Sequence, residues 1–163
     1  MAEIDYREDP DRSIEVFGTI NDELVHRLTP EIRRLRKDSQ PITVYIDSYG
    51  GSIAAFDTLR GLLFGSNQDG DYCRVVTVVT GLAASAAARL LVLGDYAIAY
   101  PHSIIHCHGS RIPGDNIDLT HEYALSMSAS LSEFNRAMAA DFSRKMTERL
   151  CWIHEFNYDD LQN

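Results

Sequence analysis

The 163-residue chain carries 24 acidic and 15 basic side chains, which gives a net charge of −9 at pH 7. This balance argues against a nucleic-acid partner, because binding to phosphates rests on Lys and Arg. The shares of hydrophobic residues (45%) and charged residues (24%) are those of a soluble globular protein. We expect a single domain over residues 13–163, preceded by a flexible acidic segment over residues 1–12.

Cysteine placement and apolar run length bear on the compartment. Cys73, Cys107 and Cys151 form no CxxC pair and no spaced framework, which favours a reducing compartment. No apolar run reaches the roughly 18 residues of a membrane span. The polar, acidic N-terminus is also unlike a signal peptide. The expected location is therefore cytoplasmic, with no membrane partner.

Runs rich in β-forming residues recur along the first part of the chain. They predict strands over residues 13–17, 42–46, 74–80, 96–100 and 103–108. The third of these runs is almost entirely β-branched and lacks polar alternation, which is typical of a strand buried on both faces of a parallel sheet. Because helical patterns separate the strands, the sequence predicts an α/β fold with right-handed crossovers.

Apolar residues at helical spacing lie between these expected strands. Asn21-Asp22-Glu23 offers the start of a first helix, Ser52 caps a second, and the apolar run 89–93 belongs to a third. A loop over 110–115 separates these elements from a long helix expected over residues 116–148.

Gly50-Gly51-Ser52 lies where the second strand turns into a helix. Glycine permits the positive φ of a sharp turn and lets a substrate backbone approach closely. The N–H groups at a helix start lack partners within the helix and can receive an oxyanion. The same residues also suit an ordinary strand-to-helix turn, and both interpretations stay open at this point.

Ser85 lies in an Ala-rich and Gly-rich run at the expected start of the third helix. A hydroxyl at this place can act as a nucleophile, and the N–H of Ala86 is then positioned to stabilise an oxyanion. The alternative is a serine that merely caps the helix in a tightly packed segment. The G-x-S-x-G motif of nucleophile elbows is absent.

Two histidines follow in the expected strand near residues 101–109. His106 and His108 project to one face of that strand, since side chains alternate with a period of two. Three interpretations stay open: a general base for Ser85, a pair of metal ligands, or polar residues at a strand end. A zinc site would need further ligands from elsewhere in the chain.

Four motifs follow one another between residue 13 and about residue 140. They are the opening strand and helix start over 13–24, ITVYIDSYGGS over 42–52, GLAASAAARLLVLG over 81–94, and the strand over 101–108. Together these motifs resemble those of the ClpP-type serine peptidases, the proteolytic subunits of the Clp protease. The resemblance implies the ClpP/crotonase-like fold of repeated β-β-α and βαβ units with a long C-terminal helix.

The resemblance also assigns roles to residues of the site. It implies that Ser85 is the nucleophile, that Gly51 and Ala86 supply the oxyanion N–H groups, and that His108 rather than His106 is the general base. No metal and no organic cofactor are implied. Tyr49 replaces the usual Pro of the family pattern.

Other departures concern the segments around and after the helix that carries Ser85. Ala86-Ala87 replaces the usual Met-Gly, and the loop over 110–115 is shorter than the Gly-rich segment of the family. The third catalytic acid falls by spacing near Glu155, with Asp159 and Asp160 within plausible gaps, in a divergent tail over 149–163.

The implied function is that of an ATP-dependent-type serine endopeptidase subunit that hydrolyses peptides or unfolded proteins. The implied partners are copies of the same chain in one heptameric ring or in stacked heptamers, and an AAA+ ATPase unfoldase. The long helix would then pack between rings through Leu125, Leu131, Phe134 and Met138.

Two other hypotheses follow from the same residues. One is a catalytically weak or inactive ring or scaffold subunit, because no acid in the tail lies in a recognisable motif. The other is a crotonase-like acyl-CoA enzyme, which is less favoured because such enzymes generally use carboxylates rather than a Ser–His pair.

Overall fold

The computed structural model describes residues 7–66, 70, 72–109 and 120–154, with side chains up to residue 147. The chain divides into two compact units, residues 1–108 and residues 109–163. Each unit is described by itself below, and the single domain expected over residues 13–163 stays a prediction.

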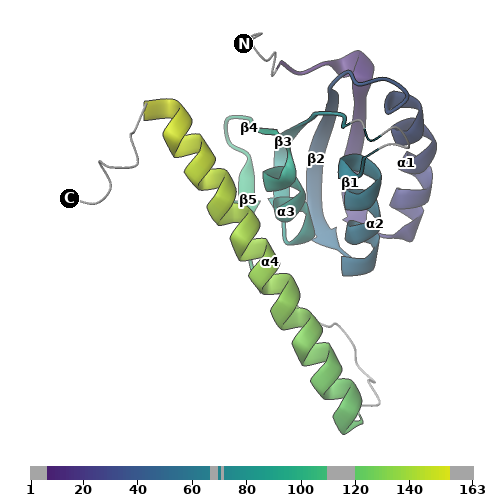
Figure 1. Ribbon diagram of the computed structural model, residues 1–163, viewed down its shortest axis with the longest axis vertical. Helices are drawn as coiled ribbons and strands as arrows, with labels where there is room; N and C mark the ends of the chain where they lie inside the picture. Colours follow the sequence, from purple (N-terminus) through teal and green to yellow (C-terminus); the bar gives the residue numbers. More distant parts are fainter. Residues whose placement is uncertain (1–6, 67–69, 71, 110–119, 155–163) are drawn as a thin grey trace. The chain divides into compact units, whose positions relative to one another are not determined.

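The first unit is built on a sheet of five parallel strands (Figure 1). In chain order these strands are β1 (Ser13–Ile20), β2 (Ile42–Gly51), β3 (Val75–Ala84), β4 (Tyr96–Ala99) and β5 (Ile104–His106). The spatial order is β1-β2-β3-β4, and β5 also pairs with β3. The predicted α/β fold with a parallel sheet is therefore confirmed.

Three helices connect these strands. They are α1 (Asp22–Leu35), α2 (Ile53–Phe64) and α3 (Ala86–Leu93), and a short 3-10 turn, η1 (Pro10–Arg12), precedes β1. The strand order follows the chain order, and α2 contacts both α1 and α3, so the three helices lie on one face of the sheet. Ser85 is the single residue between the end of β3 and the start of α3, where it stands at the N-cap position of the helix.

The predicted helix starts are formed as side-chain caps. The Asn21 carboxamide oxygen accepts the Leu24 N–H at 2.9 Å, and the Ser52 hydroxyl accepts the Ala55 N–H at 3.3 Å. Each bond satisfies one of the N–H groups that a helix start leaves without a partner. Ser52 therefore sets the start of α2, directly after the glycine pair at the end of β2.

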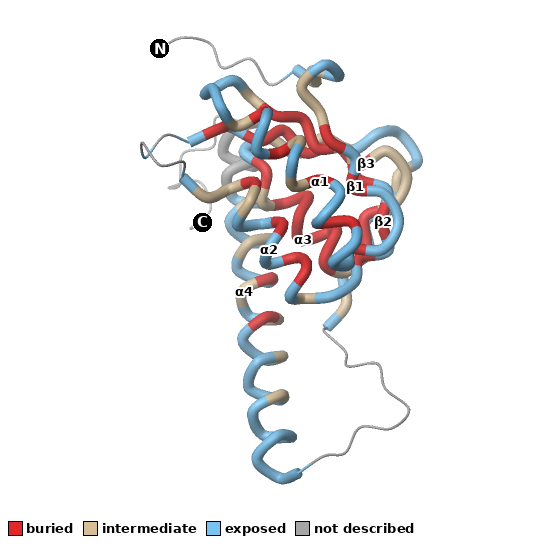
Figure 2. Tube along the Cα trace, turned by 90° about the vertical axis from the view of Figure 1, so that its right-hand side faces the viewer, coloured by how far each residue is buried: buried red, intermediate tan, exposed pale blue. Residues whose placement is uncertain are grey.

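The hydrophobic core of this unit lies between the helices and the sheet (Figure 2). The central strand β3 is buried continuously from Val75 to Val79, as its unbroken β-branched run predicts. Phe56, Leu59 and Leu63 of α2 are fully buried. This packing makes β3 and α3 a rigid base for the turn between them.

The first three strands change register at one level of the sheet. The pairing of β1 with β2 shifts between Phe17 and Thr19, and that of β2 with β3 shifts between Ile46 and Ser48. Beyond this level the first three strands run further than the sequence predicts, to Ile20, Gly51 and Ala84. The extension keeps the glycine pair and the residue before Ser85 within the sheet.

The strands β4 and β5 lie one after the other along the same edge of β3. The turn between them contains His102, whose φ of 71° is in the left-handed region. They therefore form one edge strand that is interrupted at the level where its neighbours change register.

The second unit is described from Thr120 onward, where α4 (His121–His154) begins. The Thr120 carbonyl accepts the Ala124 N–H at 2.9 Å, and the Thr120 hydroxyl accepts the Tyr123 N–H at 3.2 Å. The helix runs past Glu148, where the sequence pattern ends it, into the tail expected over 149–163. The predicted loop over 110–115 lies outside the described residues. No helix in the described part of the chain is long and apolar enough to cross a membrane.

Candidate active site

Ser85 occupies a strained turn between β3 and α3. Its backbone has φ 56° and ψ −122°, a combination that residues with a side chain rarely adopt. Its hydroxyl makes no capping hydrogen bond to the helix that it precedes. The capping alternative is therefore wrong, and the turn has the strained strand-to-helix form of a nucleophile elbow although the G-x-S-x-G motif is absent.

The turn is held in place by its backbone. The Ser85 N–H donates to the His106 carbonyl at 2.9 Å, and the Ser85 carbonyl accepts the Arg89 N–H at 3.2 Å. A backbone conformation of this kind costs on the order of 1–3 kcal/mol and persists only where its surroundings enforce it. Here the buried strand β3 and the edge strand β5 supply that support.

Gly50, the first glycine of the pair, lies directly against this turn, whereas Gly51 lies against the backbone of Ile20 in β1. A Cβ added to Gly50 would come within 2.6 Å of the Ala84 carbonyl oxygen, 2.8 Å of the Ser85 Cβ and 3.0 Å of the Ala86 nitrogen. Gly50 also has φ 89°, which a side chain would strain. The structure therefore brings the end of β2 together with Ser85 and Ala86, so that backbone groups from two elements meet beside the hydroxyl.

Two polar side chains that the sequence reasoning left without a role hold this arrangement. The buried Ser48 hydroxyl donates to the Gly18 carbonyl at 2.5 Å and accepts the Gly50 N–H at 3.0 Å. The Asp47 carboxylate accepts the Leu82 N–H at 2.9 Å. The signal that could have found them is a polar pair that follows the buried run of β2 and stands one residue before two glycines.

His106 lies in the edge strand β5 and His108 follows just beyond it, at the end of the sheet that also carries Ser85. His106 lies opposite Ala84 in the register of β3 and β5, and its carbonyl bonds to Ser85. His108 follows two residues later, so its Cα lies within about 7 Å of the His106 Cα. The two imidazole rings are 5.6 Å apart between centroids. The interactions described for residues 72–109 do not include one between the Ser85 hydroxyl and His108, so the role of His108 stays a prediction.

Cys107, between the two histidines, is not an activated nucleophile. Partial desolvation raises the pKa of its thiol above the ordinary value although the residue is exposed, and this disfavours the reactive thiolate. The raised pKa of the thiol gives no support to Cys107 as a second nucleophile, and Ser85 stays the nucleophile of the hypothesis.

The structure bears on the metal alternative but not on the third acid. Glu155, Asp159 and Asp160 lie outside the described residues, so the acid stays unassigned. Among the residues that the structure describes, no three His, Cys, Asp or Glu side chains gather closely enough to hold a metal ion. The open zinc alternative of the histidine pair therefore lacks a third protein ligand in this part of the chain.

Comparison with known proteins decides the family. A model of the family described as Clp protease matches residues 6–150. The chain belongs to the Clp protease family. It is 34% identical over 124 residues to a protein from Pleurastrum terricola named "ATP-dependent Clp protease proteolytic subunit", a match that covers 69% of this chain and 58% of that relative.

A second Clp relative matches over a longer stretch. The "ATP-dependent Clp protease proteolytic subunit 3" of Synechococcus sp. strain CC9605 is 31% identical over 153 residues, which covers 86% of this chain and 70% of the relative. The solved structure of a ClpP1 mutant from Listeria monocytogenes matches with a TM-score of 0.64 at 20% identity, covering 82% of this chain and 71% of that chain. The likeness shows that the two chains share the ClpP fold.

Proposed function

We propose that this member of the Clp protease family is the subunit of a serine endopeptidase, with Ser85 as its nucleophile. The observation that carries the proposal is the strained turn at Ser85, which presents a hydroxyl not used for capping beside the backbone of Gly50 and Ala86. Strain of this kind gathers at catalytic sites, where it serves to preorganise a reacting group.

The proposed mechanism follows from the groups assembled at this turn. His108 removes the hydroxyl proton as the Ser85 oxygen attacks a peptide carbonyl, and it returns that proton to the leaving amine. Water, activated by the same imidazole, then hydrolyses the acyl-enzyme. The N–H groups of Gly51 and Ala86 hold the oxyanion, and the loss of one such donor typically costs about 3 kcal/mol of transition-state stabilisation.

The third acid decides the rate rather than the type of reaction. In a serine protease triad, the change of the acid to its amide lowers kcat by about 10⁴ while the other groups keep their places. We propose Glu155 or Asp159 for this role. A chain without it would be the weak or inactive ring subunit that the sequence leaves as the alternative.

The proposed substrates are peptides and unfolded proteins, and the proposed assembly is a ring of identical chains supplied by an ATPase. The names of the relatives support this, since they describe proteolytic subunits of an ATP-dependent protease. The cytoplasmic location likewise stays a prediction of the cysteine pattern.

Hydrolysis of fluorogenic peptides tests the proposal. The wild-type chain, Ser85→Ala and the matched control Ser13→Ala are compared, since the Ser13 hydroxyl bonds only to the exposed Pro10 carbonyl among the interactions described. We expect Ser85→Ala to lose at least about 10³-fold in kcat/KM, because removal of a triad nucleophile costs up to about 10⁶. Equal rates for Ser85→Ala and wild type would refute it.

A further inference from the structure

The imidazoles of His106 and His108 form a pair that the proposed reaction uses only in part. Their ring centroids lie 5.6 Å apart with the planes tilted by 53°. His106 is exposed at the end of β5, and His108 is half-buried just beyond it. The proposed mechanism assigns a role to His108 alone, so the neighbouring exposed ring calls for an account of its own.

The spacing of the two rings fits a shared metal ion. A zinc–nitrogen bond of about 2.0–2.1 Å places the ring centroid roughly 3.2 Å from the metal, so two rings at a tetrahedral angle have centroids roughly 5 Å apart. The observed separation is within about half an ångström of that value.

We propose that His106 and His108 together bind a transition-metal cation that prefers imidazole, such as Zn²⁺ or Ni²⁺, and that this binding inhibits the enzyme. The pair supplies two ligands and water completes the coordination, because no group of three His, Cys, Asp or Glu among the described residues is placed to hold a metal ion. The site is thus open and readily reversible, unlike a structural zinc site with four protein ligands.

The inhibitory part of this inference rests on the proposed function. A nitrogen lone pair of His108 that is donated to a metal is no longer available to accept a proton from Ser85. The metal therefore competes with the hydroxyl proton for the same imidazole. No covalent change is involved, so removal of the metal by a chelator restores the free base.

Equilibrium binding of the metal alone tests the site without reference to activity. Zn²⁺, Ni²⁺ and Mg²⁺ are titrated into the full chain and into His106→Gln and His108→Gln. We expect Zn²⁺ and Ni²⁺ to bind and Mg²⁺ not to, since imidazole suits the first two and oxygen ligands suit the third. Each substitution should weaken binding at least about tenfold, because even the loss of an outer-shell partner has that effect.

Two control variants separate this site from other ligands. His26→Gln removes an exposed imidazole on α1, and Cys107→Ser removes the thiol between the two histidines. Both should bind Zn²⁺ as the wild type does. Unchanged binding in His106→Gln would overturn the inference, and so would equal losses in Cys107→Ser and the histidine variants.

Peptide hydrolysis with and without Zn²⁺ tests the inhibition, with each variant serving as its own reference. Zn²⁺ should lower the rate of hydrolysis at least tenfold in the wild type and leave it nearly unchanged in His106→Gln. A chain that hydrolyses no peptide but still binds Zn²⁺ through both histidines would contradict the proposed function and leave the metal site standing. Undiminished inhibition in His106→Gln would contradict the proposal that the histidine pair binds the inhibiting metal.

Discussion

Gly50 lies beside Ser85, and both its backbone conformation and its close neighbours disfavour a side chain at this position. Its φ of 89° disfavours any side chain, and a Cβ would lie 2.6 Å from the Ala84 carbonyl oxygen. Gly18 also has a positive φ, 78°, but a Cβ there would meet nothing within 4 Å. The two glycines therefore separate the effect of backbone strain from that of the close approach to Ser85.

We expect Gly50→Ala to lower both stability and peptide hydrolysis. Left-handed strain costs roughly 1–2 kcal/mol for a residue with a Cβ, and this is the whole expected effect of Gly18→Ala. Gly50→Ala should lose more than that, because the carbonyl of Ala84 must also move. Urea unfolding of both variants gives the comparison. Equal losses in the two variants would contradict the close contact.

Tyr45 predicts how stability depends on pH at the alkaline end. Burial raises the pKa of this phenol from 10.0 to about 12, and a hydrogen bond to the Glu8 carboxylate, at 3.1 Å, acts in the same direction. Folding thus favours the neutral phenol. Its stabilising effect is complete below pH 10 and is lost as the pH rises through 12.

We therefore expect the free energy of unfolding to fall between pH 10 and pH 12, and to fall less in Tyr45→Phe. Urea unfolding across this range measures the difference. The phenol absorbance should show one late titration in the wild type that the variant lacks. An identical alkaline fall in both proteins would disprove the linkage.

Some residue roles can be predicted from type and place, and others depend on contacts between distant segments. Asn21 and Ser52 are predictable caps, because a cap is a local hydrogen bond within three residues. The roles of Asp47 and Ser48 could not be predicted, since their partners Leu82 and Gly18 lie some thirty residues away in the chain.

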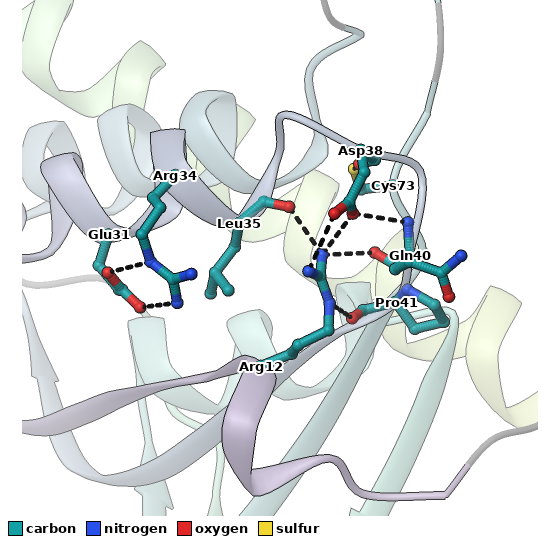
Figure 3. Close-up of polar contacts among 8 residues, drawn as sticks. All are labelled: Arg12, Glu31, Arg34, Leu35, Asp38, Gln40, Pro41 and Cys73. Atoms are coloured by element: carbon teal, nitrogen blue, oxygen red, sulfur yellow. Dashed lines mark hydrogen bonds and ion pairs between the residues drawn. The ribbon is translucent and has the colours of Figure 1, made fainter.

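At the scale of elements, Arg12 links η1 to the end of α1 and the start of β2 (Figure 3). Its guanidinium donates to both Asp38 carboxylate oxygens, at 2.7 and 3.2 Å, and to the carbonyls of Leu35, Gln40 and Pro41. The planar fork of Arg suits this set of acceptors, which an ammonium cannot match. Arg34 pairs only with Glu31 of its own helix in the same view.

We expect Arg12→Ala to destabilise the first unit by about 2 kcal/mol or more, because hydrogen bonds to charged groups contribute about 1.5–3 kcal/mol each. Arg12→Lys should recover only part of this. The control Arg34→Ala breaks an exposed pair within one helix turn and should change little. Thermal unfolding ranks the three variants, and equal behaviour of Arg12→Ala and Arg34→Ala would contradict the account.

The strand ends were the part of the elements that the sequence predicted least well. The residues 47–51 and 81–84 include Asp, Ser and Gly, which favour turns, yet they continue β2 and β3 beyond the register shift. Their pairing depends on neighbouring strands that no local pattern encodes. The centre of β3 was predictable because burial on both faces leaves a continuous β-branched run.

At the scale of the whole molecule, α4 displays apolar side chains that suit contact with other copies. Leu125 is 59% exposed and Met146 is 63% exposed, whereas Phe134 and Met138 are far less exposed. Of the residues expected between rings, Leu125 is thus the one most available to a partner. The ring itself stays a proposal.

We expect sedimentation velocity to show a large assembly for the wild type and smaller species for Leu125→Glu, since a charge at an apolar contact is poorly tolerated. Glu133→Gln, an exposed change on the same helix, is the matched control. A wild-type chain that sediments only as an 18.3 kDa monomer at working concentration would remove the ring from the account.

The family could be predicted from the sequence, because four motifs keep their order over most of the chain. The strained form of the Ser85 turn could not, since the usual elbow motif is absent and the turn is held by β5 and packed against Gly50, which are distant in the chain. The third acid is left open by the sequence as well, because the tail after residue 148 has no pattern that singles out one carboxylate.

The most direct test of the central claim is covalent labelling of Ser85 by a serine-reactive fluorophosphonate, read by intact mass and peptide mapping. The wild type should gain one adduct at Ser85, and His108→Ala should label at least tenfold more slowly, because the hydroxyl then lacks its base. Ser13→Ala should label as the wild type does. Absence of an adduct at Ser85, or equal labelling rates with and without His108, would contradict the account.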